Sequence, residues 1–209
     1  YHIEKLISDK AKDEENTIIG LKLIEEEGLM LLFIKTVIDF DTFSIITNNL
    51  VDKNVSIRDA KVIELNDGSC IYNFYTDMPK GDAYDIDNKL ESLIGNLSLR
   101  LEKKQINSNK KFKLPRRLRS FSTSTKVNFL EDHVHNRTVL EMVSIDRPGL
   151  LVDISEVLRR NNIWIESAKI ATIGERAEDV FYLRNEHQDV IPLETTKRLE
   201  SELIESLDN

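Results

Sequence analysis

The chain has 209 residues, of which 40% are hydrophobic and 32% charged, and its formal net charge at pH 7 is −8. The length fits two domains of roughly 100 residues each, and the composition is typical of soluble globular proteins. The negative charge argues against a nucleic-acid-binding surface, which needs basic residues to meet the phosphates. The longest apolar run covers residues 29–34, far short of the roughly 20 residues that span a membrane. We therefore expect neither nucleic-acid nor membrane partners.

The first residues have the pattern of the end of a helix, and no charged-then-apolar signal peptide begins at Tyr1. Because the first residue is Tyr rather than Met, we expect the chain to be cut from a longer protein whose catalytic chemistry could lie upstream. The lone cysteine, Cys70, has strand-like neighbours, so we expect a small core residue rather than a reactive thiol. The absence of an internal disulfide favours a reducing, cytoplasmic location.

An internal repeat divides the chain. The segment NVSIRDAKV at residues 54–62 returns as NIWIESAKI at residues 162–170, and the offset, 162 minus 54, is 108 residues. This offset is about the length of one small domain. An apolar run and then a helical pattern come before each copy, so the repeat extends beyond the matching strings.

The periodicity of apolar residues predicts the same elements in each half. In the first half we expect strands at 17–24 and 31–38, a helix through 43–51, strands at 55–64 and 69–76, and a helix at 84–101. In the second half we expect strands at 125–130 and 139–145, a helix through 151–158, strands at 163–173 and 177–183, and a helix at 193–207.

Polar residues mark both ends of the first helix in each half. Asp39 and Asp146 lie where N-cap residues belong, and Pro148 suits a first helical turn. Asn54 and Asn162 lie where these helices should end, in keeping with the preference for Asn at helix C-termini.

Each half should therefore be an α+β sandwich of the ferredoxin-like type, in the order ββαββα, with a four-stranded antiparallel sheet and both helices on one face. A ferredoxin-like fold usually places its last strand after the last helix, but only two residues follow residue 207. We expect the spare strand at the front of each half to fill that edge, beside the first core strand. The expected domains are residues 1–101, with a leading helix and strand, and residues 124–209.

Residues 102–123 would form the linker, and they hold the one basic stretch of an acidic chain: Lys103, Lys104, Lys110, Lys111, Lys113, Arg116, Arg117 and Arg119. A solvated connector is the simplest interpretation. A surface that docks on the acidic domains, or on an upstream catalytic domain, is the alternative. RNA binding is least favoured, because only Phe112 and Phe121 are interleaved with the charges and no stacking platform is evident.

The string DRPGLL at residues 146–151 follows a strand and opens a helix, and it resembles the signature of the ACT domains, which sense small molecules. The strings PRRLRSF at 115–121 and TIGERAEDVF at 172–181 make the resemblance more specific. With them, the chain resembles the C-terminal part of the bacterial PII uridylyltransferase/uridylyl-removing enzymes, most strongly over residues 115–183.

This resemblance implies that the chain is the regulatory part of a bifunctional enzyme. In that family a nucleotidyltransferase domain attaches UMP to a PII signalling protein, a metal-dependent hydrolase domain removes it, and two ACT domains sense glutamine and switch the balance. The catalytic motifs, and the Mg²⁺ they imply, would belong to upstream domains. We therefore expect no catalytic residue, cofactor or metal site in this chain. His133 and His135 are the only close histidine pair and fit a solvated turn.

The loop at the start of the second helical pattern is the candidate ligand site. A helix N-terminus offers unpaired N–H groups to a carboxylate, and a glycine lets a ligand approach the backbone. Aspartate and arginine could complement an ammonium group and a carboxylate or amide. We expect glutamine or another small amino acid to bind at Asp146, Arg147, Pro148, Gly149 and Leu150. The alternative is purely structural, with Asp146 capping the helix and Gly149 packing tightly.

The corresponding string in the first half, DFDTF at residues 39–43, is one residue shorter and has neither proline nor glycine. Asp41 would bring a negative charge near the place of Gly149, so we expect the first domain to supply a pairing face, within one chain or between chains. Three functions remain open. They are a glutamine-sensing pair of a PII-modifying enzyme, a tandem ACT regulator in another amino-acid pathway, and a pairing module without a ligand.

Overall fold

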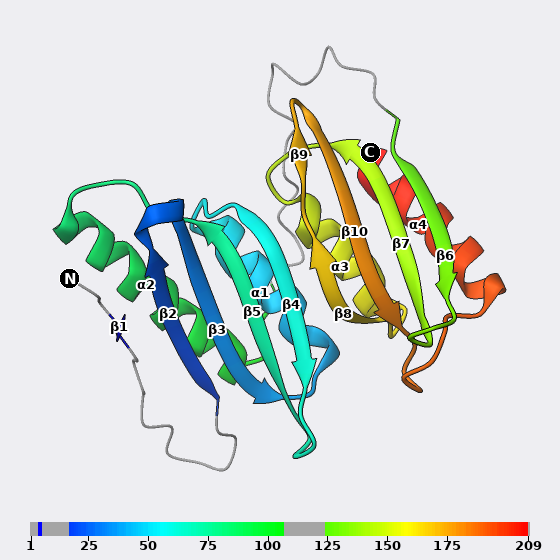
Figure 1. The fold of residues 1–209 in the computed structure, drawn as a ribbon, viewed down its shortest axis with the longest axis horizontal. Helices are drawn as coiled ribbons and strands as arrows, with labels where there is room; N and C mark the ends of the chain where they lie inside the picture. Colours follow the sequence, from blue (N-terminus) through cyan, green and yellow to red (C-terminus); the bar gives the residue numbers. More distant parts are fainter. Residues whose placement is uncertain (1–3, 6–16, 107–123, 209) are drawn as a thin grey trace. The chain divides into compact units, whose positions relative to one another are not determined.

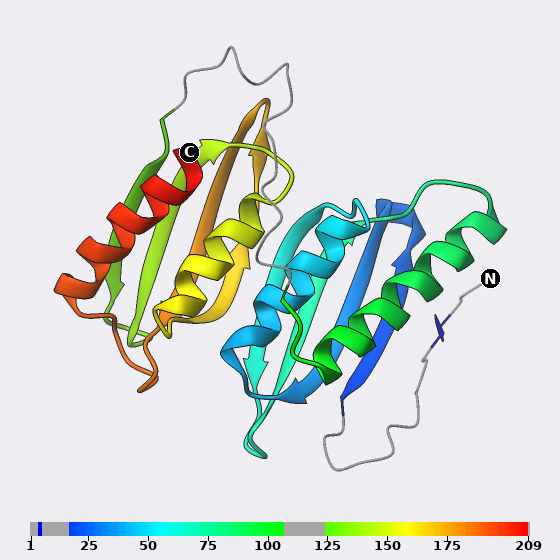
Figure 2. The ribbon, with the colours of Figure 1, turned by 180° about the vertical axis from the view of Figure 1, so that it is seen from behind.

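The computed structural model describes residues 4–5, 17–106 and 124–208, and the chain divides into two compact units, Tyr1–Ile106 and Asn107–Asn209. In each unit two helices cover one face of an antiparallel sheet (Figures 1 and 2). The expected α+β fold with ββαββα order is confirmed in both units. None of the described helices is both long and apolar enough to cross a membrane.

From β2 onwards, the main strands and helices of the first unit follow the expected order. The elements of this unit are β1 (Glu4–Lys5), β2 (Ile18–Ile24), the short 3-10 helix η1 (Glu25–Glu27), β3 (Leu29–Val37), α1 (Phe40–Asp52), β4 (Ile57–Glu64), β5 (Ser69–Asp77) and α2 (Ala83–Glu102). The strand order is β1-β2-β3-β5-β4, and every pair is antiparallel. The leading strand β2 pairs with β3 from Ile18↔Lys35 to Ile24↔Leu29, so its predicted place at the edge is confirmed.

The helix expected at the start of the chain is wrong for the two residues that the structure describes there. Glu4 and Lys5 form a short strand and pair with Lys22 and Leu21 of β2. The rest of the expected helix lies outside the described residues. The physical reason is that the outer edge of β2 presents unpaired N–H and C=O groups, which an extended segment can satisfy.

The second unit repeats this architecture. Its elements are β6 (Lys126–Asp132), β7 (Arg137–Ile145), α3 (Leu150–Arg160), β8 (Trp164–Lys169), β9 (Thr172–Ile173), β10 (Arg176–Arg184) and α4 (Leu193–Asp208). The strand order is β8-β10-β7-β6, and the short strand β9 pairs with β10. Again the leading strand β6 lies at the edge beside the first core strand β7.

The strand expected at residues 163–173 is interrupted between β8 and β9. At the break, the carbonyl of Ala171 accepts a hydrogen bond from the N–H of Glu178 at 2.8 Å. The N–H of Ala171 instead donates to the Asp179 side chain, Oδ1, at 3.3 Å. The Asp179 carboxylate thus accepts the hydrogen bond that a backbone carbonyl accepts in a regular strand pair.

The first helix of each unit ends as the sequence predicts. Asn54 and Asn162 have positive φ values of 55° and 54°, in the left-handed region that suits a helix-ending residue. The N–H of the next residue then reaches back to the last helical turn. Val55 donates to the carbonyl of Leu50 at 2.9 Å, and the corresponding bond in the second unit is also 2.9 Å. The repeated asparagine therefore marks a repeated backbone motif.

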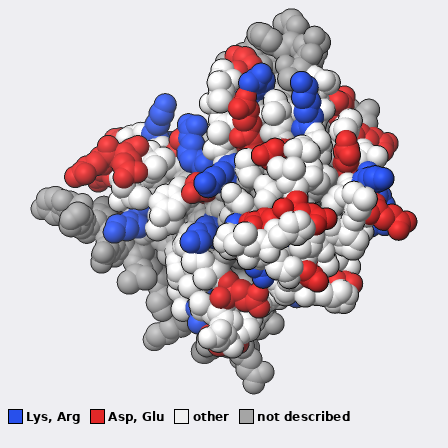
Figure 3. Space-filling view, turned by 45° about the vertical axis from the view of Figure 1, so that its right-hand side comes forward, with Lys and Arg blue, Asp and Glu red and all other residues white. Residues whose placement is uncertain are grey.

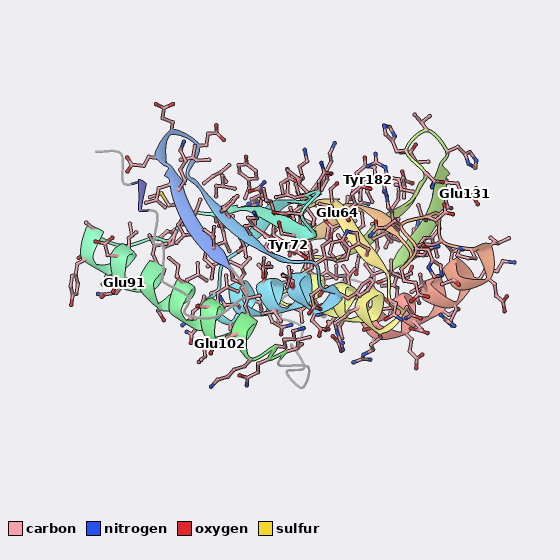
Figure 4. The ribbon with its side chains drawn as sticks, turned by 90° about the horizontal axis from the view of Figure 1, so that it is seen from below. Glu64, Tyr72, Glu91, Glu102, Glu131 and Tyr182 are labelled. Atoms are coloured by element: carbon pink, nitrogen blue, oxygen red, sulfur yellow. The ribbon has the colours of Figure 1, made fainter. Side chains whose placement is uncertain are left out.

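Each core lies between the sheet and its two helices. In the first unit, alternate residues of β3 and β5 are buried against α1, and the rings of Phe43 and Phe74 pack with centroids 5.2 Å apart. Figure 4 shows Tyr72 on the helix side of its sheet, where it is 1% exposed. Cys70 is fully buried, and desolvation raises the pKa of its thiol to about 12, so the expected core role is confirmed.

Candidate functional site

The candidate site is the four-residue loop, residues 146–149, that joins β7 to α3. The N–H of Asp146 donates to the carbonyl of Glu175 at 3.0 Å, which ties the loop to the β9–β10 turn. Gly149 precedes the helix with a φ of 83°, a conformation that favours glycine. The N–H of Leu150 donates to the backbone carbonyl of Arg147 at 3.1 Å, and no side chain of the described residues caps the first turn of α3. The first turn of α3 therefore has N–H groups without a side-chain acceptor in the described part of the chain.

The expectation that Asp146 caps α3 is wrong. Its Oδ2 instead accepts a hydrogen bond from the hydroxyl of Thr172 at 3.2 Å. Pro148, expected in the first helical turn, is exposed and lies two residues before Leu150, where the helix begins. The cause is the left-handed turn at Gly149, which delays the helix and leaves Asp146 too far back to reach its first amides.

The corresponding loop of the first unit, between β3 and α1, has a different structure. Only residues 38 and 39 separate β3 from α1, whereas residues 146–149 separate β7 from α3. The loop is therefore two residues shorter than its counterpart, and the expected difference of one residue is wrong. Asp39 caps the helix as predicted, because its Oδ1 accepts from the N–H of Asp41 at 2.8 Å. Lys104 Nζ, from the start of the basic stretch, lies 2.7 Å from the other carboxylate oxygen. The N-terminus of α1 is thus occupied by the chain's own carboxylate.

Arg147 turns inward from the loop and is 9% exposed. Its Nη2 donates to Asp153 Oδ2 at 2.6 Å, an ion pair with the first turn of α3. Its Nη1 is buried and has no hydrogen-bond partner within the described part of the chain. An unsatisfied buried donor on a charged group is costly, so this nitrogen is available to an anionic or carbonyl oxygen.

Asp179 is a further candidate residue that the site prediction missed. It lies on β10, points into the core and is 1% exposed. Its Oδ2 is buried without a hydrogen-bond partner among the described residues. Desolvation, with a smaller contribution from Asp146, raises the pKa of this carboxyl to about 7, against the opposing hydrogen bond from Ala171. The signal was available, because the strand alternates Ala177, Asp179 and Phe181 on its buried face.

The histidine pair and the outer face of the sheet offer no further candidate site among the described residues. His135 Nδ1 lies 2.9 Å from Asp132 Oδ2, and His133 is exposed. Within residues 4–5, 17–106 and 124–208, no group of three or more His, Cys, Asp or Glu side chains could hold a metal ion. On the side of its sheet away from the helices, Tyr182 (Figure 4) packs against the Arg137 guanidinium, 4.1 Å from the ring centroid.

The charges do not form a single basic patch on the face drawn in Figure 3, where acidic and basic side chains are intermixed. Most of the predicted basic linker, residues 107–123, lies outside the described residues, so its three interpretations stay open.

Comparison with known proteins identifies the class of the second unit's fold. Residues 138–201, which include the candidate loop, match the family model of the ACT domain. The second unit is therefore an ACT domain.

The similarity to named proteins extends over both units. The chain is 30% identical over 98% of its length to the bifunctional uridylyltransferase/uridylyl-removing enzyme of Photobacterium profundum, and 31% identical over 91% to that of Idiomarina loihiensis. It spans only 23% and 22% of those two relatives. The chain is thus a relative of one portion of these enzymes, and the predicted resemblance is confirmed. The comparisons support a regulatory role.

A solved structure, aspartate kinase from Synechocystis, aligns with 84% of this chain and 26% of its own, with 13% identity and a TM-score of 0.46. A likeness at this level supports no conclusion about function.

Proposed function

We propose that the chain is the glutamine-sensing regulatory region of a cytoplasmic PII uridylyltransferase/uridylyl-removing enzyme, which controls nitrogen-status signalling. Glutamine binds the second unit at the loop formed by Asp146, Arg147, Pro148, Gly149 and Leu150. Upstream domains of the same protein attach UMP to PII and remove it, and ligand binding here biases the two activities. Pairing of ACT domains, within one chain or between chains, transmits the change.

The contrast between the two helix N-termini is the observation that supports this proposal best. Asp39 caps α1, whereas no side chain caps α3. The α-carboxylate of an amino acid can accept from N–H groups at the start of α3 that no side chain of the described residues caps, where the helix dipole favours negative charge. Gly149 has no Cβ to obstruct that approach, and Arg147 Nη1 is a buried donor without a partner among the residues that the structure describes. These groups together suit an amino-acid ligand.

Calorimetric titration of L-glutamine tests the proposal. We expect the wild-type chain to bind, and Gly149→Val to abolish binding because a branched side chain would stand where the ligand carboxylate approaches. Gly68→Val is the matched control. Gly68 also has a positive φ, 79°, with open space around it, and it lies in the β4–β5 hairpin of the first unit. Both variants should lose similar stability, but only Gly149→Val should lose affinity.

The other outcomes separate the alternatives. Binding of a different amino acid in place of glutamine would favour a regulator in another pathway. No heat with any amino acid at millimolar concentration would leave a pairing module, and equal affinity in wild type and Gly149→Val would move the site away from this loop.

A further inference from the structure

Two carboxylates of the second unit accept hydrogen bonds from two consecutive residues, one from each. Asp179 Oδ1 accepts from the N–H of Ala171 at 3.3 Å, and Asp146 Oδ2 accepts from the hydroxyl of Thr172 at 3.2 Å. They come from different elements, since Asp179 lies on β10 and Asp146 follows β7. Burial raises the pKa of Asp179, and the nearby negative charge of Asp146 adds a smaller rise.

These hydrogen bonds leave the negative charge uncompensated. Each donor is a single neutral group, and Asp179 Oδ2 has no donor at all within the described residues, although the residue is 1% exposed. A buried carboxylate oxygen without a partner is costly, and a second carboxylate nearby adds repulsion. The pair would therefore be stabilised by a cationic donor that the described part of the chain does not supply.

The position of the pair restricts what that donor can be. Asp146 belongs to the same loop as Gly149, three residues before it, so the loop that leads into the start of α3 also holds one member of the acidic pair. An α-amino acid carries an ammonium group and a carboxylate on one carbon, and it would match an acidic pair beside free N–H groups. A metal ion fits less well, because no metal-like cluster of three or more ligands exists among the described residues.

We infer that Asp179, through its unpartnered Oδ2, receives the ammonium group of the amino acid whose carboxylate meets the N-terminus of α3, with Asp146 as the second acceptor. The inference rests on the proposed function of the loop and adds a residue that lies about 30 positions further along the chain, on β10. It makes Asp179 a specificity-determining residue, because it selects ligands with a positively charged amino group over their deaminated analogues.

The test compares two ligands in two variants of the whole chain. L-Glutamine carries the ammonium group, and glutaramate is the same molecule without it. Asp179→Asn keeps the shape and an acceptor for Ala171 but removes the charge. The control is Glu178→Gln on the opposite face of the same strand, where Glu178 forms an ion pair with Arg176. Calorimetric titration gives each affinity, and thermal melting checks that each variant folds.

We expect Asp179→Asn to weaken glutamine binding by roughly ten- to a hundred-fold, the usual effect of losing a charge-assisted hydrogen bond. Its affinity for glutaramate should equal that of the wild type, and Glu178→Gln should change neither ligand. Unchanged glutamine affinity in Asp179→Asn would overturn the inference and leave glutamine binding at the loop intact. Equal weakening of both ligands would overturn it in favour of a structural role. If the wild type binds neither ligand, the proposed function fails, and the inference fails with it.

Discussion

At the residue scale, the second unit contains buried side-chain atoms that have no hydrogen-bond partner in the described part of the chain. Asp179 Oδ2 and Arg147 Nη1 are both buried and without hydrogen-bond partners among the described residues. Natural proteins satisfy most buried polar atoms, and the exceptions are concentrated at sites that bind or react. Two further atoms of this unit, Glu166 Oε2 and Arg184 Nε, are buried without a hydrogen bond but form an ion pair with each other at 3.2 Å. Arg147 Nη1 lies in the loop that the sequence singled out for its glycine and its charges, and Asp179 lies near Asp146 of that loop.

The titration of Asp179 gives a prediction about stability and pH. Its pKa rises from 3.8 to about 7 in the folded chain, so the folded state keeps a proton that the unfolded state releases between these values. The carboxyl therefore costs no stability below about pH 4, costs more as the pH rises, and costs most above pH 7. At about 1.4 kcal/mol per pKa unit, the full cost is at most ~4 kcal/mol.

Asp179→Asn should remove this cost, so the variant should be more stable than the wild type at pH 8, by on the order of 1–4 kcal/mol, and nearly equal to it at pH 4. Urea unfolding at both pH values measures the difference. A stability difference that does not change with pH would show that Asp179 ionises normally in the folded chain.

At the scale of elements, the repeat made most of the fold predictable. Alternation of apolar residues located the four main strands of each unit but neither β1 nor the separate strand β9. Asn54 and Asn162 located the ends of α1 and α3, because the left-handed conformation that ends a helix favours so few residue types. What local patterns missed depends on tertiary contacts. The break after β8 requires the Asp179 carboxylate to replace a backbone partner of Ala171, and sequence periodicity contains no such information.

The junction between β7 and α3 was only partly predictable for a related reason. Asp146 has the residue type and the position of an N-cap, but the turn at Gly149 shifts the start of the helix. Its carboxylate instead accepts a hydrogen bond from the Thr172 hydroxyl. In the first unit the same expectation for Asp39 was correct, because no glycine turn intervenes. The preference for aspartate at helix N-caps thus predicted the cap of α1 correctly and the cap of α3 wrongly.

The ends of these helices give a second prediction. Asn162 has a φ of 54°, which costs a β-branched residue about 1–2 kcal/mol more than it costs Asn or Gly. Asn162→Val should therefore lower the free energy of unfolding by about that amount, and Asn162→Gly should change it by only a few tenths of a kcal/mol. Chemical unfolding of the two variants measures this. Equal losses in both would mean that the asparagine side chain, rather than its backbone conformation, stabilises the helix end.

At the scale of the whole molecule, two units of one architecture have diverged at one junction. In the first, Asp39 fills the helix N-terminus, and in the second the N-terminus of α3 has no side-chain cap and the acidic pair of Asp146 and Asp179 lies beside it. This division fits the proposed regulatory region, in which one copy binds the ligand and the other supplies packing. The chain spans about a quarter of the relatives that it matches.

The most direct test of this account is amide chemical-shift mapping of the ¹⁵N-labelled chain during addition of L-glutamine. We predict that the largest shifts fall on the amides of Gly149 and Leu150 at the start of α3, and on Ala171 and Thr172, which contact the acidic pair. The amides of residues 39–42 at the start of α1 should not move. Shifts centred on residues 39–42, or no shifts at millimolar glutamine, would contradict the assignment of the second unit as the glutamine sensor.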